Sequence, residues 1–347
     1  MIPSLGAVQV VAVILSFTPL AIAAVGLRLW SRHIIHSPLA FNDYMAILAL
    51  ILTIGENITS LIVVFIGISG VHVSEVLAKD PSLLVIYLKN AIPGEILWAA
   101  ANTAVKLSIV SLYTTLFPNQ RFTYVCYATM VASVALFIIV FLEAFFLCTP
   151  VEYNWDKTIP GGVCNQGVAF LVSGIMNLII DAFIVILPMP LLFKLQLPLF
   201  KRLGVAVMFS LGAVICILSL FRIIALQTWD LSDVTFGSPQ VSIYSSIEPT
   251  IGVINACLPT IKPAIYKLCG KEVYEVSKSH PKDTMQSGLD NDQGNSTASG
   301  TYSGPFYRLK DQKPLTPQAD NEVSAGNERA VWEAQSLEIA HETKHNL

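Results

Sequence analysis

Charged residues are scarce in this sequence. Only 13% of its 347 residues are Asp, Glu, Lys or Arg, well below the roughly 25% that is usual in soluble domains. Hydrophobic residues make up 54%, and the mean hydropathy is +0.62. A chain so poor in charge is expected to present much of its surface to a lipid bilayer. Its net charge of −3 gives no sign of a nucleic-acid partner.

The sequence also lacks the marks of a cleaved leader and of common enzymes. No basic segment precedes the first apolar run, and this run is longer than the roughly 7–15 apolar residues of a signal peptide. We interpret it as a first membrane helix that stays in place as an uncleaved anchor. Neither HExxH, GxSxG nor an aspartate-rich diphosphate motif occurs, so the sequence does not predict an enzyme.

Long apolar runs dominate what is present. A helix that crosses a bilayer needs about 20 mostly apolar residues. Seven runs qualify, at about 7–29, 44–68, 90–116, 122–147, 167–193, 203–227 and 243–266. We therefore predict an all-α polytopic membrane protein with a seven-helix membrane domain over 1–270. The polar segment 271–347 cannot bury enough apolar surface to offset chain entropy, so we expect a mostly disordered cytosolic tail.

Basic residues set the expected orientation. They gather in the first, third and fifth loops and at the adjoining helix ends, as Arg28, Arg32, Arg121, Lys194, Lys201 and Arg202. Loops rich in Lys and Arg stay on the cytosolic side. With seven spans, the N-terminus is then outside and the tail inside. We expect a multi-pass protein of the plasma membrane.

Polar residues recur at helical spacing inside the apolar runs. They are Glu95, Asn102 and Lys106 in the third run, Asn177 and Asp181 in the fifth, Arg222 in the sixth, and Glu248 and Asn255 in the seventh. Ionisable groups in a bilayer are costly and by default indicate function. We expect Glu95, Asp181 and Glu248 to face one polar cavity. Arg222 lies at a similar depth to Glu248 and is expected to pair with it. The alternative is that these groups only join the helices by hydrogen bonds.

Two cysteines lie in the fourth loop, which is predicted to be outside. Disulfides persist in oxidising compartments, so we expect a Cys148–Cys164 bond, with two free thiols as the alternative. No His or second Cys pair lies nearby, which argues against a zinc site. Cys269 follows the last span beside Lys267 and Lys271. It is a candidate palmitoylation site, the alternative being an unmodified cysteine.

An ordered set of short motifs extends from about Arg28 to Lys267. It includes Asp43-Tyr44, the stretch Lys106 to Tyr113, a Cys-x-Pro, Trp-Asp and Gly-x-Cys pattern in the fourth loop, Leu187-Pro-Met-Pro190, Ser219-Leu-Phe-Arg222 and Cys257-Leu-Pro-Thr-Ile-Lys-Pro263. In this order the motifs resemble the fungal rhodopsin-domain family, also called the satratoxin-cluster integral membrane protein family, which is related to fungal seven-helix surface-cue receptors.

The resemblance implies a receptor-like protein that senses a small molecule or surface cue and signals to a cytosolic protein. The alternative is a transporter or exporter linked to a secondary-metabolite pathway. Both hypotheses share every feature that the sequence shows.

The family name also suggests retinal. A retinal Schiff base needs a desolvated lysine in the middle of the last helix, with a carboxylate counter-ion. Lys262 is the only candidate, and it lies near the cytosolic end between two prolines. The resemblance implies that other members of the family have Arg at this position, and an arginine cannot form the Schiff base. We therefore expect no cofactor.

Overall fold

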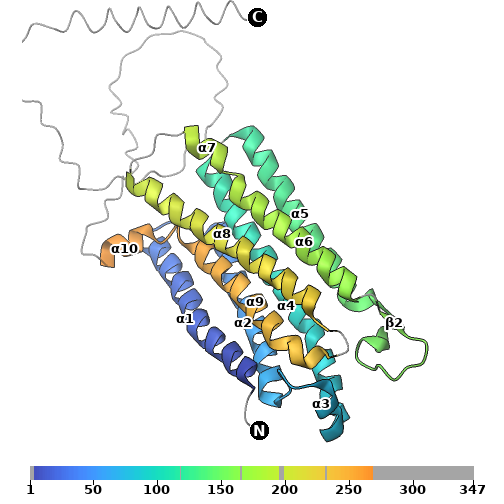
Figure 1. The fold of residues 1–347 in the computed structure, drawn as a ribbon. Coiled ribbons are helices and arrows are strands. Elements are labelled where there is room, and N and C mark those ends of the chain that lie inside the picture. Colours follow the sequence, from blue (N-terminus) through green and yellow to red (C-terminus); the bar gives the residue numbers. More distant parts are fainter. Residues whose placement is uncertain (1–3, 118, 165, 195–198, 231–232, 269–347) are drawn as a thin grey trace, which may run out of the picture. The chain divides into compact units, whose positions relative to one another are not determined.

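The computed structural model describes residues 4–117, 119–164, 166–194, 199–230 and 233–268. The predicted disordered tail at 271–347 and the candidate palmitoylation site at Cys269 lie outside the described residues. The described part is mostly helical (Figure 1). Its helices are α1 (Leu5–Ile34), α2 (Phe41–Ile66), α3 (Val73–Lys79), α4 (Pro81–Leu116), α5 (Gln120–Phe146), α6 (Gln166–Ile186), α7 (Met189–Lys194), α8 (Leu199–Thr228), α9 (Val234–Cys257) and α10 (Lys262–Leu268).

Six helical segments are long and apolar enough to cross a membrane among the residues described. They are α1, α2, α4, α5, the segment Gly167–Leu191 and the segment Ala206–Thr228. The protein is thus an integral, multi-pass membrane protein. Helix α9 is also long, at 24 residues, but it does not reach the same apolar standard, because polar residues and two prolines interrupt it.

The long helices pack side by side in a ring, and α4 is the member that also reaches into its interior. Along the ring, α1 packs on α2, α2 on α4, α4 on α5, α5 on α6, α6 on α8, and α8 on α9, which returns to α1. Helix α4 also contacts α9 and α6 across the interior. Its most apolar stretch is 67% buried, against 28% for α1 and 22% for α5. The central position explains why α4 tolerates several polar residues: they face protein and not lipid.

Local sequence explains how several helices begin and end. The Ser4 hydroxyl oxygen accepts a hydrogen bond from the N–H of Ala7 at the start of α1. Helix α2 ends at Gly67, whose φ of 80° suits a residue without a side chain. Asp80 accepts the N–H of Ser82 at the start of α4, and hydrogen bonds from Ser82 lower the pKa of the Asp80 carboxyl.

Two of the predicted spans are interrupted by proline. The segment expected at 243–266 lies in α9, which begins earlier and ends at Cys257, and in α10 after a turn that contains Pro259. The segment expected at 167–193 is divided between α6 and α7, with Pro188 at the break. Proline lacks the N–H that a helix interior needs and restricts the residue before it. Hydropathy alone does not register this effect.

A clasp joins the start of α3 to the start of α9. The Nδ1 of His72 pairs with Oδ2 of Asp233, and the His72 ring stacks on Phe236 with 4.2 Å between centroids. The backbone N–H of Val73 donates to Asp233 Oδ1 at 2.8 Å. This bond first, and then His72, lower the pKa of Asp233. The Asp233 carboxylate therefore stays ionised at any pH above the usual range of an aspartate.

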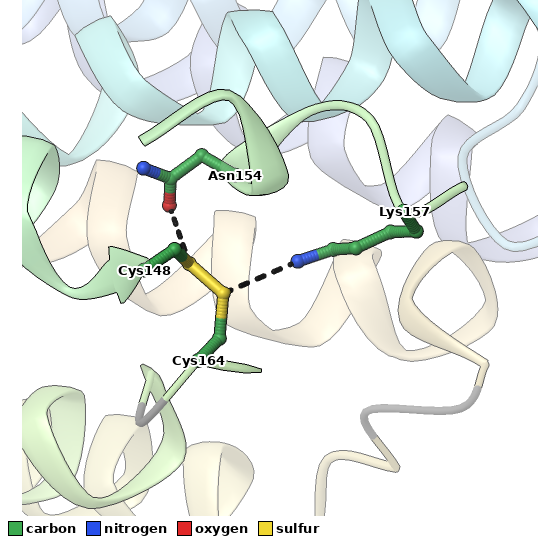
Figure 2. The surroundings of a disulfide bond; sticks show 4 residues. All are labelled: Cys148, Asn154, Lys157 and Cys164. Carbon is green, nitrogen blue, oxygen red and sulfur yellow. Dashed lines mark hydrogen bonds between the residues drawn. A yellow bond between two sulfur atoms is a disulfide. The ribbon is translucent and has the colours of Figure 1, made fainter. Parts of the chain in front are cut away.

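The loop between α5 and α6 contains the predicted disulfide. Strands β1 (Cys148–Thr149) and β2 (Val163–Cys164) are antiparallel and place the two cysteines opposite each other, and they are bonded. Oδ1 of Asn154 lies 2.9 Å from the sulfur of Cys148, and Nζ of Lys157 lies 3.6 Å from that of Cys164; Figure 2 shows these four side chains. Partial burial lowers the pKa of Lys157. The expectation of a disulfide is confirmed.

Thiol labelling under denaturing conditions should reveal this bond. Two of the six cysteines should label only after reduction. Replacing Cys148 and Cys164 by Ser should destabilise the protein by less than the roughly 2–5 kcal/mol typical of small secreted domains, because lipid also holds the helices. Full labelling of every cysteine without reductant would contradict the bond. The control is a Cys126→Ser variant, which removes a cysteine that is not in the disulfide.

Candidate functional site

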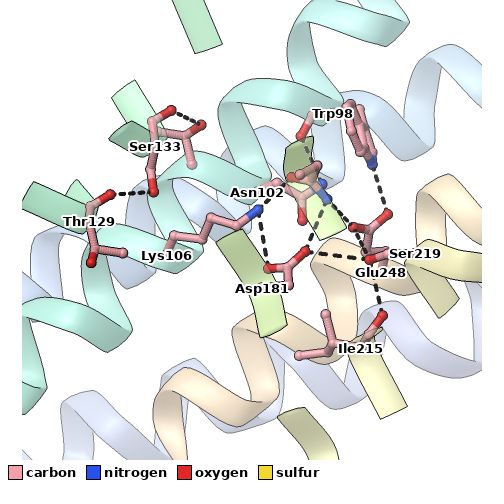
Figure 3. A network of polar contacts seen from close by, with 11 residues as sticks. Trp98, Asn102, Lys106, Thr129, Ser133, Asp181, Ile215, Ser219 and Glu248 are labelled. Carbon is pink, nitrogen blue, oxygen red and sulfur yellow. Dashed lines mark hydrogen bonds and ion pairs between the residues drawn. The ribbon is translucent and has the colours of Figure 1, made fainter. Parts of the chain in front are cut away.

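A buried ionic network lies at the centre of the bundle. The Lys106 ammonium lies 3.2 Å from Oδ1 of Asp181 and donates a hydrogen bond of 2.5 Å to Oδ1 of Asn177. The Asn177 amide in turn donates to Asp181 Oδ2 at 3.0 Å and to Glu248 Oε1 at 2.8 Å. All four side chains are at least nine-tenths buried. The network joins α4, α6 and α9 (Figure 3).

Glu248 is the most buried carboxyl of the network. It is 0% exposed, and it also accepts hydrogen bonds from the Ser219 hydroxyl at 2.8 Å and from Nε1 of Trp98 at 3.3 Å. The Ser219 oxygen also lies 3.4 Å from Oδ2 of Asp181. A hydroxyl has one proton to donate, so Ser219 can serve only one carboxyl at a time. Through Ser219 the network extends to α8.

A second ionic group lies nearer the start of α4. Nη2 of Arg222 is 3.2 Å from both carboxylate oxygens of Glu95, and Nε donates to the Ser245 hydroxyl at 3.0 Å. The guanidinium lies over the Trp98 ring, 3.4 Å from its centroid. The expected Arg222–Glu248 pair is therefore wrong. The prediction used only the similar depth of Arg222 and Glu248 along their helices. Depth does not show that Trp98 contacts both side chains, or that Glu95 reaches Arg222.

A cavity of about 70 Å³ adjoins the ionic network. Five of the predicted residues line it, namely Asn102, Lys106, Asp181, Glu248 and Asn255. Glu95, Asn177 and Arg222 do not line it. Of the three predicted acids, Asp181 and Glu248 thus share this cavity, while Glu95 lies with Arg222 beside Trp98.

The rest of the cavity wall is apolar and lies toward one end of the bundle. The wall includes Tyr113, Leu116, Phe117, Ile184, Pro188, Met208 and Phe209. These residues come from the end of α4, the end of α6 and the early part of α8, with Phe117 directly after α4 and Pro188 between α6 and α7. The cavity therefore extends from the ionic network toward the ends of α4 and α6. These ends lie near α7 (Figure 1).

Asn255 is unusual among the lining residues. Its side chain is 6% exposed, and within the described part of the chain its Oδ1 accepts no hydrogen bond. Asn102, by contrast, donates to the carbonyl of Trp98 at 3.2 Å. A buried acceptor without a donor is costly, so Asn255 Oδ1 is a ready acceptor for a group in the cavity.

Sequence reasoning missed two residues of the network. Trp98 lies three residues after Glu95 and four before Asn102, and Ser219 lies three before Arg222. Residues at these spacings share a helix face. The periodicity places both on the polar faces, but the sequence prediction did not include Trp98 and used Ser219 only as part of a family motif.

A separate buried ion pair lies near α10. Arg28 is 0% exposed; its Nε donates to Oδ1 of Asp43 at 2.8 Å, and its Nη1 donates to the carbonyl of Ala256 at 2.6 Å. Nε of Arg32 lies 3.0 Å from Asp43 Oδ2. A cation is favourable beside the free carbonyls at a helix C-terminus. From the sequence, Arg28 was interpreted only as one of the basic residues on the cytosolic side. In the structure, its contacts join α1, α2 and α9.

No cluster of three or more His, Cys, Asp or Glu suited to a metal occurs among the described residues. The side chain of Lys262 is not among those described. The expectation that retinal is absent therefore stays a prediction.

Comparison with known proteins gives one family and several relatives. The family model of the fungal rhodopsin domain matches residues 27–267. The wortmanamides biosynthesis cluster protein C of Talaromyces wortmannii is 27% identical over 71% of this chain and 67% of its own length. A SAT4 family membrane protein of Emericella nidulans is 26% identical over 74% and 68%, and the receptor GIN3 of Arthrobotrys oligospora is 24% identical over 88% and 73%. No solved structure matches the chain.

Proposed function

This chain belongs to the fungal rhodopsin domain family, and on that premise we propose a receptor-like function, in which a small molecule binds inside the helix bundle. The proposal includes seven spans, with the N-terminus outside, the C-terminus in the cytosol and the plasma membrane as the location. Helix α9 is the seventh span. Its contacts with α1, α2, α4 and α8 support this assignment, because its polar residues face protein.

The observation that carries the proposal is the buried network beside the cavity. It joins α4, α6, α8 and α9 through Lys106, Asn177, Asp181, Ser219 and Glu248. A receptor needs an element with two arrangements whose balance a ligand changes. The single Ser219 proton between two carboxyls offers such alternatives. A ligand that contacts Asp181 or Glu248 would change the contacts between all four helices.

The signal would then reach a cytosolic protein. The cavity extends toward the end of the bundle that the basic residues place inside the cell. A change in helix packing there would alter the adjacent loops and the tail. The name of the receptor GIN3, which this chain resembles, supports this role. No enzymatic step forms part of the proposal.

An exporter is the second candidate. Its specific support is that the cavity lies in the proposed cytosolic half, while the Arg222–Glu95 pair and Trp98 lie toward the opposite end of α4. An inward-facing exporter has this arrangement. The name of the wortmanamides cluster protein is compatible with a role beside a secondary-metabolite pathway.

Substitution of Asp181 by Asn should separate function from folding. Native mass spectrometry of the purified protein would first identify a co-purifying small molecule. In proteoliposomes, saturable binding without flux supports a receptor, and saturable flux supports an exporter. We expect Asp181→Asn to abolish either activity, since it removes the counter-charge of Lys106, while expression is kept.

The matched control is Glu56→Gln. Glu56 is a buried carboxyl that contacts Ser60 and Ser246 at 3.4 Å and does not line the cavity. It should retain binding or flux. If Asp181→Asn lowers activity only in proportion to the loss of folded protein, the network is structural and the proposal fails.

A further inference from the structure

The charges beside the cavity do not balance. Two carboxyls line it, Asp181 and Glu248, against the single ammonium of Lys106. Lys106 pairs with Asp181 at 3.2 Å, whereas Glu248 accepts only from uncharged donors among the residues described. The other cation of this region, Arg222, pairs with Glu95. An uncompensated buried charge is costly, so Glu248 favours a positively charged group.

The second indication is the unpartnered acceptor of Asn255. It lies two helical turns from Glu248 on the same face of α9, and both residues line the cavity. Asn255 and Glu248 thus both line the cavity, and both carry acceptor oxygens. An ammonium group carries three donors and no acceptor. It is the chemical group that complements this part of the wall.

The remaining wall favours an organic body over a bare ion. Tyr113, Phe117, Met208 and Phe209 line the cavity away from Glu248, and aromatic rings attract cations as well as apolar groups. The volume of about 70 Å³ is several times the roughly 10–15 Å³ that one water needs on this measure. A single sodium ion would leave most of that space unfilled.

We propose that the cavity binds a small protonated amine. Its ammonium group lies between Glu248 and Asn255, and its apolar part extends toward Phe117 and Phe209. Lys106 pairs with Asp181, so Glu248 is the lining carboxyl without a charged partner among the residues described. This inference rests on the proposed small-molecule function and specifies the class of ligand.

Binding of phenethylamine to the purified full-length protein tests the inference. At saturation it should raise the melting temperature by roughly 3 °C, while 2-phenylethanol, a neutral molecule of similar shape, should not. Glu248→Gln should abolish the shift. Asn255→Leu should weaken binding about tenfold, as expected for a lost hydrogen bond to a charged group. Glu56→Gln, which alters a buried carboxyl outside the cavity, should bind like the wild type.

The melting temperature is also measured in sodium chloride and in choline chloride at equal ionic strength. This comparison shows whether sodium alone stabilises the protein. An equal shift with 2-phenylethanol, a shift with sodium alone, or wild-type binding by Asn255→Leu would each overturn the amine assignment. Asn255→Leu decides the matter if Glu248→Gln does not fold. A neutral or anionic co-purifying ligand that needs Asp181 would refute the amine and leave the proposed receptor function standing.

Discussion

Replacing Asp43 by asparagine should destabilise the protein by about 3–5 kcal/mol, the range for breaking a buried ion pair by removing one partner. Arg28 is fully buried and lies 2.8 Å from this carboxylate. The substitution keeps the size of the side chain but leaves the guanidinium without its counter-charge. Because Arg28 also holds the carbonyl of Ala256, contacts among α1, α2 and α9 should weaken together. The thermal melting of purified protein measures the effect.

Arg32→Gln is the matched control. Arg32 contacts the same carboxylate, but its side chain is 19% exposed, and ion pairs in contact with water are worth about 0–1 kcal/mol. Its melting temperature should therefore fall far less. The double variant Arg28→Met with Asp43→Leu should recover part of the loss, since it removes both buried charges. Melting of Asp43→Asn at the wild-type temperature would disprove the buried pair.

Replacing Lys106 by methionine should have an effect of similar size, about 3–5 kcal/mol. Methionine keeps most of the side-chain length and removes the charge. The carboxyls of Asp181 and Glu248, both joined to Asn177, would then face each other without a cation. Melting curves of the purified protein measure the loss.

A second substitution tests whether Lys106 and Asp181 stabilise the protein as a pair. Lys106→Met combined with Asp181→Asn should be more stable than Lys106→Met alone, since residues in one network are not additive. Lys79→Met, at an exposed lysine in α3, should stay within about 0.5 kcal/mol of the wild type. If the double variant loses the sum of both single effects, Lys106 and Asp181 are not coupled.

The sequence by itself determined the helical character and the polar faces. Apolar runs report membrane segments because each span must satisfy its backbone internally and present apolar side chains to lipid. The spacing of Asn177 and Asp181, and of Glu248 and Asn255, placed each pair on one helix face, and all four meet in or beside the cavity region. The short separation of Cys148 and Cys164 within one loop likewise indicated their bond. These features depend on neighbours along the chain.

Only the tertiary structure decided which charges meet. Arg222 and Glu95 are 127 residues apart, and Arg28 and Ala256 are 228 apart. Such partners depend on how each helix is rotated about its axis and on which helix occupies the centre. Hydropathy gives depth along a helix but not that rotation, so similar depth led us to expect Glu248, and not Glu95, as the partner of Arg222. The side chain of Trp98 contacts both Arg222 and Glu248. Only the packing of the helices in three dimensions shows these contacts.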